Sequence, residues 1–542
     1  MAGRLVRPLI LVRGFGGADV SDEASSPYQG FNNGTVYPGR RGDNYIYEGF
    51  LLRALKSVDY PYRDATNVVG YYADEVPPPP RWDDLPEDLV RGTVVLDPAT
   101  QKRVLSAGVA GTIWVYRYYD LRPRALQRYG EGLGRLIRLI QASADRRDEP
   151  FAGVDVVAHS MGGLVVREAV KAMHRTERGS ARRLVHRVVT LGTPHRGIAF
   201  QRLPSWLLRA LPKVNDAADE LAAFDPEHTT FLEWEKFFDV GRVLTIVGTN
   251  HRTYATAPSL ANRVAGLLDE GTLAYSRSDG LVRQAAAQLP GAPRTFVHKC
   301  HGGLDSLVTS REAYEIAMRF LHGTHKVSLW LHEAKISRGE DWFGKSEFYF
   351  GVSIKPRYVD FELVHQSPEA ENCYGPFAKT DLSDDLPDLA DELRKPLAAH
   401  GDKTTSWAGP NRLIWQGWID GGAKPDDAKG LVFRIDVYVG ERDTFGIGFS
   451  DNVVFRKQYY IQAFPGDPVE LFIHTGEEHL RDNNPTGAER LRQIAQASPS
   501  APVQRPQRID VADSETAETW AFRIQGTGFT ATFHLGLEPA AD

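Results

Sequence analysis

The residues with the clearest chemical potential lie in segment 154–163, Val-Asp-Val-Val-Ala-His-Ser-Met-Gly-Gly. Its valine-rich first half is typical of a parallel strand buried on both faces, and the residues that follow have the apolar spacing of a helix. Ser160 stands between the two, with Ala158 two positions before it and Gly162 two after. This pattern predicts a nucleophile elbow, a strained turn that presents the serine hydroxyl at a helix N-terminus. The alternative is a serine that merely caps the helix.

A carboxylate and a histidine suited to this serine follow later in the chain. After Ser160 come two predicted strands, 188–191 and 243–248, and then Asp279 in a polar turn. One further predicted strand leads to His301. A serine with a histidine base and a carboxylate that orients the histidine is the arrangement of nucleophilic acyl transfer.

Other residues compete for the same roles. His298 and Asp305 flank His301 and are the alternative base and acid. His195, in the segment Gly-Thr-Pro-His-Arg-Gly, is more often a loop histidine without a chemical role. His159, next to the serine, is expected to fill the elbow and to take no part in catalysis.

Two backbone N–H groups are expected to bind an oxyanion beside Ser160. A buried strand at 9–12 leads into Arg-Gly-Phe-Gly-Gly, where glycines allow N–H groups to point into a site. The predicted donors are Phe15, in this loop, and Met161, which follows the serine. The loop does not contain the glycine pattern of a dinucleotide site or the lysine of a phosphate loop.

Residues 198–240 form an apolar, partly helical insertion between two predicted strands. Over an active site such insertions act as lids or acyl-binding walls, and helices that only pack are the alternative. The predicted substrate-binding residues are Trp206, Leu207, Leu208 and Leu211.

The bulk composition is that of an ordinary globular protein, with 42% hydrophobic and 25% charged residues among 542. The net charge of -6 gives no general attraction to nucleic acid. Two cysteines form no disulfide framework, and we expect free thiols. The apolar run at the start is too short for a signal peptide, and no run has the ~20 apolar residues of a membrane-spanning helix. A cytoplasmic protein, or one exported without a recognisable signal, is therefore expected.

The pattern changes near residue 324. Before it, strands alternate with helices, which predicts a parallel sheet covered on both faces. After it, most strands follow one another without helices, which predicts an antiparallel sandwich. The expected strands are 327–331, 347–354, 412–418, 432–439, 471–474, 519–525 and 530–535. The sequence therefore predicts an α/β domain over 1–323 and an all-β accessory domain over 324–542.

Acidic residues gather in two predicted loops of the second domain. Oxygen ligands of this kind suit Ca²⁺, and solvated acidic loops are the alternative. The calcium candidates are Asp341, Glu347, Asp443 and Asp451. Trp342 and Phe343, beside the first of them, are candidates for insertion into a lipid surface or for the core.

These motifs together resemble a known family. The elbow 158–163, the segment Leu-Gly-Thr-Pro-His-Arg-Gly at 191–197, Ser-Asp-Gly-Leu-Val at 278–282 and His-Gly-Gly-Leu at 301–304 resemble those of lipase-type α/β-hydrolases. The resemblance is to small bacterial lipases and to lipases like the GPI inositol-deacylase, and it spans about residues 9–322. These lipases usually have His-Gly in the oxyanion loop, where this chain has Arg13 before Gly14.

The resemblance implies a serine carboxylic-ester hydrolase that cleaves lipid or acyl esters through an acyl-enzyme. Ser160 would be the nucleophile, His301 the base and Asp279 the residue that orients the base. This chemistry requires no metal or organic cofactor. A catalytically idle scaffold that binds lipid or a partner, and an acyltransferase with the same three residues, are the alternatives. Acyl chain length, head group and oligomeric state do not follow from the sequence.

Overall fold

The computed structural model describes the chain in segments that form two compact units. Most residues up to Ala317 belong to the first unit, and most residues from Met318 onward belong to the second. The domain boundary at Gly323 stays a prediction. The described residues are 6–14, 49–57, 59–60, 68–72, 108–118, 126–196, 234–250, 278–284, 286–302, 305–336, 346–356, 359, 361–365, 374–377, 412–420, 430–443, 452–466, 468–480, 486–497, 506–512 and 519–540.

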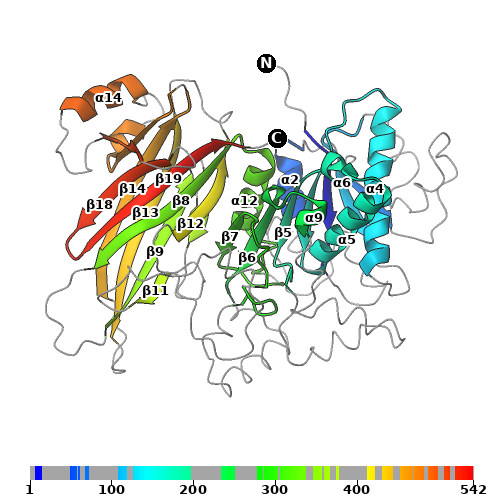
Figure 1. Ribbon diagram of the computed structural model, residues 1–542, viewed down its shortest axis with the longest axis horizontal. Helices are drawn as coiled ribbons and strands as arrows, with labels where there is room; N and C mark the ends of the chain where they lie inside the picture. The colour runs from blue at the N-terminus through cyan, green and yellow to red at the C-terminus, as the bar shows by residue number, and fades with distance from the viewer. Residues whose placement is uncertain are drawn as a thin grey trace, which may run out of the picture. The chain divides into compact units, whose positions relative to one another are not determined.

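A seven-stranded sheet lies at the centre of the first unit, in the order β2-β3-β1-β4-β5-β6-β7 (Figure 1). Every neighbouring pair from β2 to β6 is parallel. The loops that follow these strands therefore meet at one edge, and the order reverses between β1 and β4, where α/β sheets bind ligands. The strands are β1 Leu9–Val12, β2 Val68–Tyr72, β3 Ile113–Arg117, β4 Val154–His159, β5 Val185–Leu191, β6 Val243–Gly248 and β7 Arg294–Val297.

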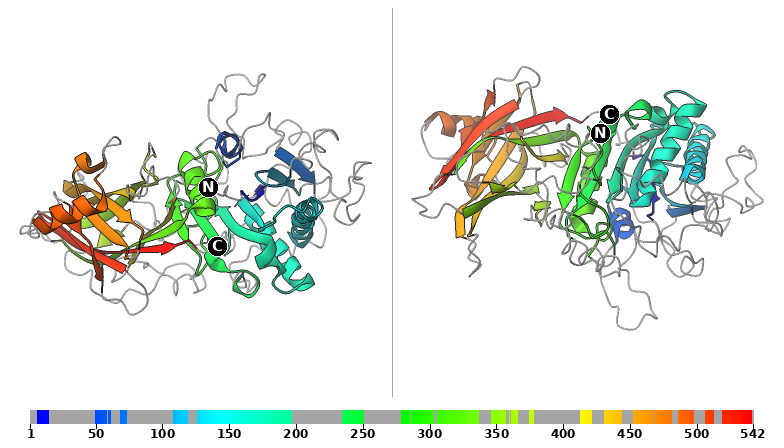
Figure 2. Two further views of the ribbon diagram at one scale, coloured as in Figure 1. Left: turned by 90° about the horizontal axis from the view of Figure 1, so that it is seen from above. Right: turned by 60° about the horizontal axis from the view of Figure 1, so that its bottom comes forward.

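Helices cover this sheet because its strands are apolar on both faces. Ile10 and Ala158 belong to the cluster formed with helices α4 and α5, whereas Leu9 and Val157, on the opposite face, are equally buried. Figure 2 shows α4 and α5 side by side next to the sheet. The helices of this region are α2 Phe50–Lys56, α4 Leu126–Asp145, α5 Met161–Thr176, α6 Ser180–Leu184, α9 Trp234–Phe237 and α12 Arg311–His322, with a short 3₁₀ turn, η2, at Val240–Arg242.

The second unit is built from two antiparallel sheets. One has the order β10-β9-β13-β14-β15-β16, with β11 beside β9, and the other has the order β12-β8-β19-β18-β17. Its strands are β8 His325–Ile336, β9 Ser346–Pro356, β10 Val364–His365, β11 Tyr374–Phe377, β12 Arg412–Ile419, β13 Leu431–Asp443, β14 Asn452–Phe464, β15 Glu470–His474, β16 Gln507–Arg508, β17 Asp510–Ala512, β18 Thr519–Gly526 and β19 Phe529–Pro539, with 3₁₀ turn η4 at Glu477–Leu480 and helix α14 at Ala488–Ala497.

Aromatic side chains join these two sheets face to face. Phe350 of β9 and Phe455 of β14 both contact Phe529 of β19, with ring centroids 5.8 and 5.2 Å apart. Trp415 of β12 lies 5.8 Å from Phe433 of β13. Since each pair takes one ring from each sheet, the unit is the β-sandwich that the sequence predicts.

The structure does not test the calcium prediction, because it describes the side chain of none of the four candidates. Strand register pairs Asp443 with Ser346 and Glu347 with Arg442, so both acidic residues lie at the same end of one sheet. Asp341 and Asp451 lie outside the described residues. Within those residues there is no group of three or more side chains that would hold a metal ion. The calcium site stays a prediction.

Candidate active site

Ser160 occupies a strained turn between β4 and α5. Its φ of 52° and ψ of −127° lie in a region that L-residues rarely adopt, and the described residues include only one other non-glycine residue with a positive φ, Asp148. The turn needs a glycine two positions on, because a Cβ on Gly162 would collide with the carbonyl oxygens of Val12 and Arg13. The turn therefore brings the start of α5 against the end of β1 and places the serine over the carboxyl edge of the sheet.

The polar contacts of the candidate site centre on His301. Its Nε2 lies 2.8 Å from Ser160 Oγ, and its Nδ1 lies 2.8 Å from Asp279 Oδ2. Because an ionised carboxylate only accepts hydrogen bonds, Nδ1 carries the proton and Nε2 accepts from the serine hydroxyl. All three residues are buried, so these bonds lie in a medium of low dielectric constant. The arrangement can remove the proton from Ser160 and stabilise the imidazolium that results.

The carboxylate of Asp279 is fixed by its own turn. Oδ1 accepts backbone N–H groups from Leu281 at 3.0 Å and Val282 at 2.7 Å, which leaves Oδ2 for His301. The end of β6 lies close behind the side chain, since a Cβ on Gly248 would stand 2.7 Å from that of Asp279. Both oxygens therefore have partners, and the acid has little freedom to turn away.

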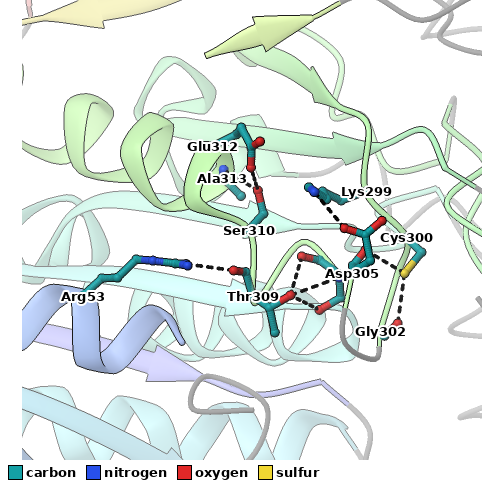
Figure 3. A network of polar contacts seen from close by, with 10 residues as sticks. Arg53, Lys299, Cys300, Gly302, Asp305, Thr309, Ser310, Glu312 and Ala313 are labelled. Carbon is teal, nitrogen blue, oxygen red and sulfur yellow. Dashed lines mark hydrogen bonds and ion pairs between the residues drawn. The ribbon is translucent and has the colours of Figure 1, made fainter. Parts of the chain in front are cut away.

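Polar contacts join the residues next to His301 to Asp305, and Figure 3 shows those of Lys299 and Cys300. The Cys300 N–H donates to the Asp305 carbonyl at 3.0 Å, and the Cys300 thiol lies within hydrogen-bond distance of two carbonyls, those of Gly302 and Asp305. Lys299 closes the loop through an ion pair, with Nζ 2.7 Å from Asp305 Oδ1. Lys299 and Cys300, which precede His301, are thus bonded to Asp305, which follows it.

The competing sequence candidates occupy other positions. Asp305 pairs with Lys299 and not with His301, and His298 is exposed at the end of β7. His195 is buried, with Nε2 2.9 Å from Thr190 Oγ1 and its ring 6.0 Å from that of Trp234. Burial, and then the charge of Arg167, lowers the pKa of His195 to about 3.

Several predicted residues lie outside the described part of the chain. Met161 is described. It is the first residue of α5, so its backbone N–H has no acceptor within the helix. Phe15, the other predicted oxyanion donor, is not among the described residues, nor are the four predicted substrate-binding residues, Trp206, Leu207, Leu208 and Leu211. Cys300 is a buried thiol that is not in a disulfide, and Cys373 lies outside the described segments.

The sequence did not predict the contacts that surround His301. Lys299 and Asp305 clamp its loop, and the His159 ring nitrogen Nε2 lies 2.9 Å from its carbonyl oxygen. No spacing rule connects residues 159 and 301, so only the folded chain reveals this contact.

Comparison with known proteins agrees with this architecture. Residues 117–217 match the PGAP1-like alpha/beta domain. The fold is an α/β-hydrolase fold, with a mostly parallel sheet and helices packed on it. The matched segment includes Ser160 and ends before Asp279 and His301.

Three solved structures show distant similarity to the chain. The mature lipase BlEst2 from Bacillus licheniformis is 16% identical, with a TM-score of 0.32 over 59% of this chain and 93% of that one. A putative cell surface hydrolase from Lactobacillus plantarum is 12% identical, with a TM-score of 0.29 over 59% and 92%. Phospholipase PlaB from Legionella pneumophila, in complex with thio-NAD, is 13% identical, with a TM-score of 0.28 over 66% and 86%. No curated protein sequence matches the chain.

The membrane prediction can be compared with the helices. None of the helices in the described segments has the length and apolarity needed to cross a bilayer. The place of the protein in the cell stays a prediction.

Proposed function

We propose that the first unit is a serine carboxylic-ester hydrolase that cleaves lipid or acyl esters through an acyl-enzyme. The observation that carries this proposal is the buried series Ser160 Oγ, His301 and Asp279, joined by two contacts of 2.8 Å. A serine that merely caps a helix requires neither a positive φ nor a histidine at hydrogen-bond distance. The lipase-type fold supports the same class of chemistry.

In the first half of the reaction, Ser160 Oγ attacks the ester carbonyl carbon while His301 Nε2 takes the hydroxyl proton. The tetrahedral intermediate then collapses, the C–O bond to the alcohol breaks, and His301 returns the proton to the leaving oxygen. In the second half, His301 removes a proton from water, which attacks the acyl carbon. The bond between that carbon and Ser160 Oγ then breaks, His301 returns the proton to Oγ, and the acid is released. Asp279 orients the imidazole throughout and stabilises its cation.

The developing oxyanion would be bound at the N-terminus of α5. Met161 N–H stands there directly after the serine, where the helix dipole favours negative charge. A Cβ on Gly14 would lie 2.6 Å from that of Ser160, so the chain leaving β1 passes over the nucleophile. This approach supports the Phe15 N–H as the second donor. Loss of one such donor typically reduces the rate by about 10²–10³.

The acyl chain is proposed to bind against the insertion at residues 198–240, through Trp206, Leu207, Leu208 and Leu211. The second unit is proposed to be an accessory module, because the reacting residues Ser160, Asp279 and His301 all belong to the first unit. A lipid surface is the partner that we propose for it. Neither role requires a metal or organic cofactor for the chemistry itself.

Hydrolysis of a chromogenic ester panel, from acetyl to long acyl, by the full-length protein tests the function. We expect hydrolysis together with labelling of Ser160 by a fluorophosphonate probe. An acyltransferase would instead give a new ester when a second alcohol is supplied. A protein that neither hydrolyses any ester nor reacts with the probe would be the idle scaffold.

A further inference from the structure

The backbone of His301 contacts one of its two side-chain partners, Asp279, and the residue that precedes the other, Ser160. Its N–H donates to the main-chain carbonyl of Asp279 at 2.8 Å. Its carbonyl oxygen lies 2.9 Å from Nε2 of His159, the residue before Ser160. The peptide groups of His301 are therefore tied to the acid turn on one side and to the nucleophile strand on the other.

The direction of the second hydrogen bond follows from its acceptor. A carbonyl oxygen only accepts, so Nε2 of His159 must carry a proton. Burial of the ring, and then the neighbouring His301, lowers the pKa of His159 to about 3, so the ring is neutral near pH 7. Nδ1 is then the unprotonated nitrogen. It faces the chain leaving β1, since a Cβ on Gly14 would lie 2.9 Å from it.

The position of His159 at the end of a strand gives this hydrogen bond a rigid support. His159 is the last residue of β4, and its Cα partner in the parallel ladder is Leu191 of β5. The residue that carries the nucleophile follows at once. A donor on His159 therefore sets the distance between the backbone of the base and the strand that carries the serine. The two imidazole rings also pack, with centroids 4.9 Å apart and planes inclined by 40°.

We propose that His159 is a positioning residue, whose Nε2–H holds the carbonyl of His301 and so keeps the base in register with Ser160. The proposal rests on the hydrolase function proposed above. It replaces the expectation that His159 only fills the elbow. His159 itself transfers no proton to the substrate, and it acts through the placement of His301.

Loss of this donor should act on the chemical step more than on substrate binding. The His301 carbonyl would lose its hydrogen bond with His159, and the loop that carries His301 would take a different position. Displacement of a catalytic group by about 1 Å costs roughly 10²-fold in rate. The acyl and alcohol parts of the substrate would bind as before, so kcat should fall and KM should stay nearly constant.

Three variants of the full chain separate the effect of the hydrogen-bond donor from the effect of side-chain volume. His159→Leu substitutes an apolar side chain of similar bulk and removes the donor. His159→Gln places an amide N–H₂ at about the reach of the imidazole Nε2, and His159→Asn carries the same amide on a shorter side chain. We expect His159→Leu to reduce kcat about 10- to 100-fold with KM within about threefold. His159→Gln should recover most of the loss, and His159→Asn should resemble Leu.

Thermal midpoints of the variants provide the control for a purely structural role. If Leu and Gln reduced kcat equally, or if kcat followed the thermal midpoint in all three variants, the positioning role would be wrong. A His159→Leu protein with wild-type kcat would also refute it. If the wild type hydrolysed no ester and did not react with fluorophosphonate, the hydrolase proposal itself would fail. Nitrogen-15 histidine spectra would then show whether the Nε2–H tautomer of His159 exists apart from any activity.

Discussion

Nε2 of His301 lies 2.8 Å from the hydroxyl oxygen of Ser160, although the two residues are separated by 141 positions in the chain. The contact exists because β4 ends at the carboxyl edge of the sheet and the loop that carries His301 lies at the same edge. It makes Ser160 the candidate nucleophile of the protein, and the predictions below start from it.

Replacing Ser160 with alanine should abolish ester hydrolysis and fluorophosphonate labelling while the fold is retained. The variant removes the reacting oxygen and adds no bulk to the turn. Labelling, measured by intact mass, and hydrolysis of a short acyl ester provide the test. Ser143→Ala is the matched control, because the hydroxyl of Ser143 is also buried but donates to the Leu139 carbonyl within α4. Unchanged labelling of the Ser160 variant would place the nucleophile elsewhere.

Replacing His301 with alanine should lower kcat by roughly 10³-fold or more, because loss of one member of a triad removes the action of all three. His298→Ala should leave kcat near the wild-type value, since His298 is exposed. Steady-state kinetics on one soluble ester compares the two. Reversal of the two effects would mean that the base has been assigned to the wrong histidine.

Asp279 and Asp305 allow the same comparison for the acid. Asp279→Asn keeps the size of the side chain and takes away the charge that orients His301, and such a change typically costs about 10⁴-fold in kcat. Asp305→Asn removes the charge that pairs with Lys299. It should reduce kcat far less, since it weakens only the ion pair that joins the two ends of the histidine loop. Equal losses in the two variants would contradict the assignment of Asp279.

Buried His195 should make the first unit less stable in acid. Its pKa of about 3 when folded is below the ordinary value of 6.5, so below pH 6.5 the unfolded chain binds a proton that the folded chain does not. The stability contributed by the neutral ring is thus complete above pH 6.5 and is lost as the pH falls toward 3. Between pH 7 and 5 we expect this residue to cost about 2 kcal/mol in the free energy of unfolding.

Urea unfolding of the wild type and of His195→Gln at both pH values measures this difference. The glutamine keeps a donor toward Thr190 and does not titrate, so its stability should fall less between pH 7 and 5. Other histidines with lowered pKa values, His159 and His186, titrate in both proteins and cancel in the comparison. The same decrease in both proteins would show that His195 is not the responsible group.

Much of this architecture followed from local pattern. The valine run before Ser160 and the helix spacing after it predicted β4 and α5, because a buried parallel strand and an amphipathic helix each have a periodicity that is visible in one segment. Strand patterns after residue 324 predicted the sandwich for the same reason. The longest omission was β14, Asn452–Phe464, where the charged residues Arg456 and Lys457 conceal the alternation that pairs this strand with β13.

The sequence by itself determined which residues have the chemistry of a hydrolase and in what order they come. Only the tertiary structure decided which of them meet: His301 rather than His298 contacts the serine, Asp279 rather than Asp305 contacts the histidine, and His159 holds the His301 carbonyl. The physical reason is that residue type and strand period are local properties of the chain. These hydrogen bonds join residues between 22 and 142 positions apart, so they depend instead on sheet order, on loop closure and on which other groups each carboxylate already contacts.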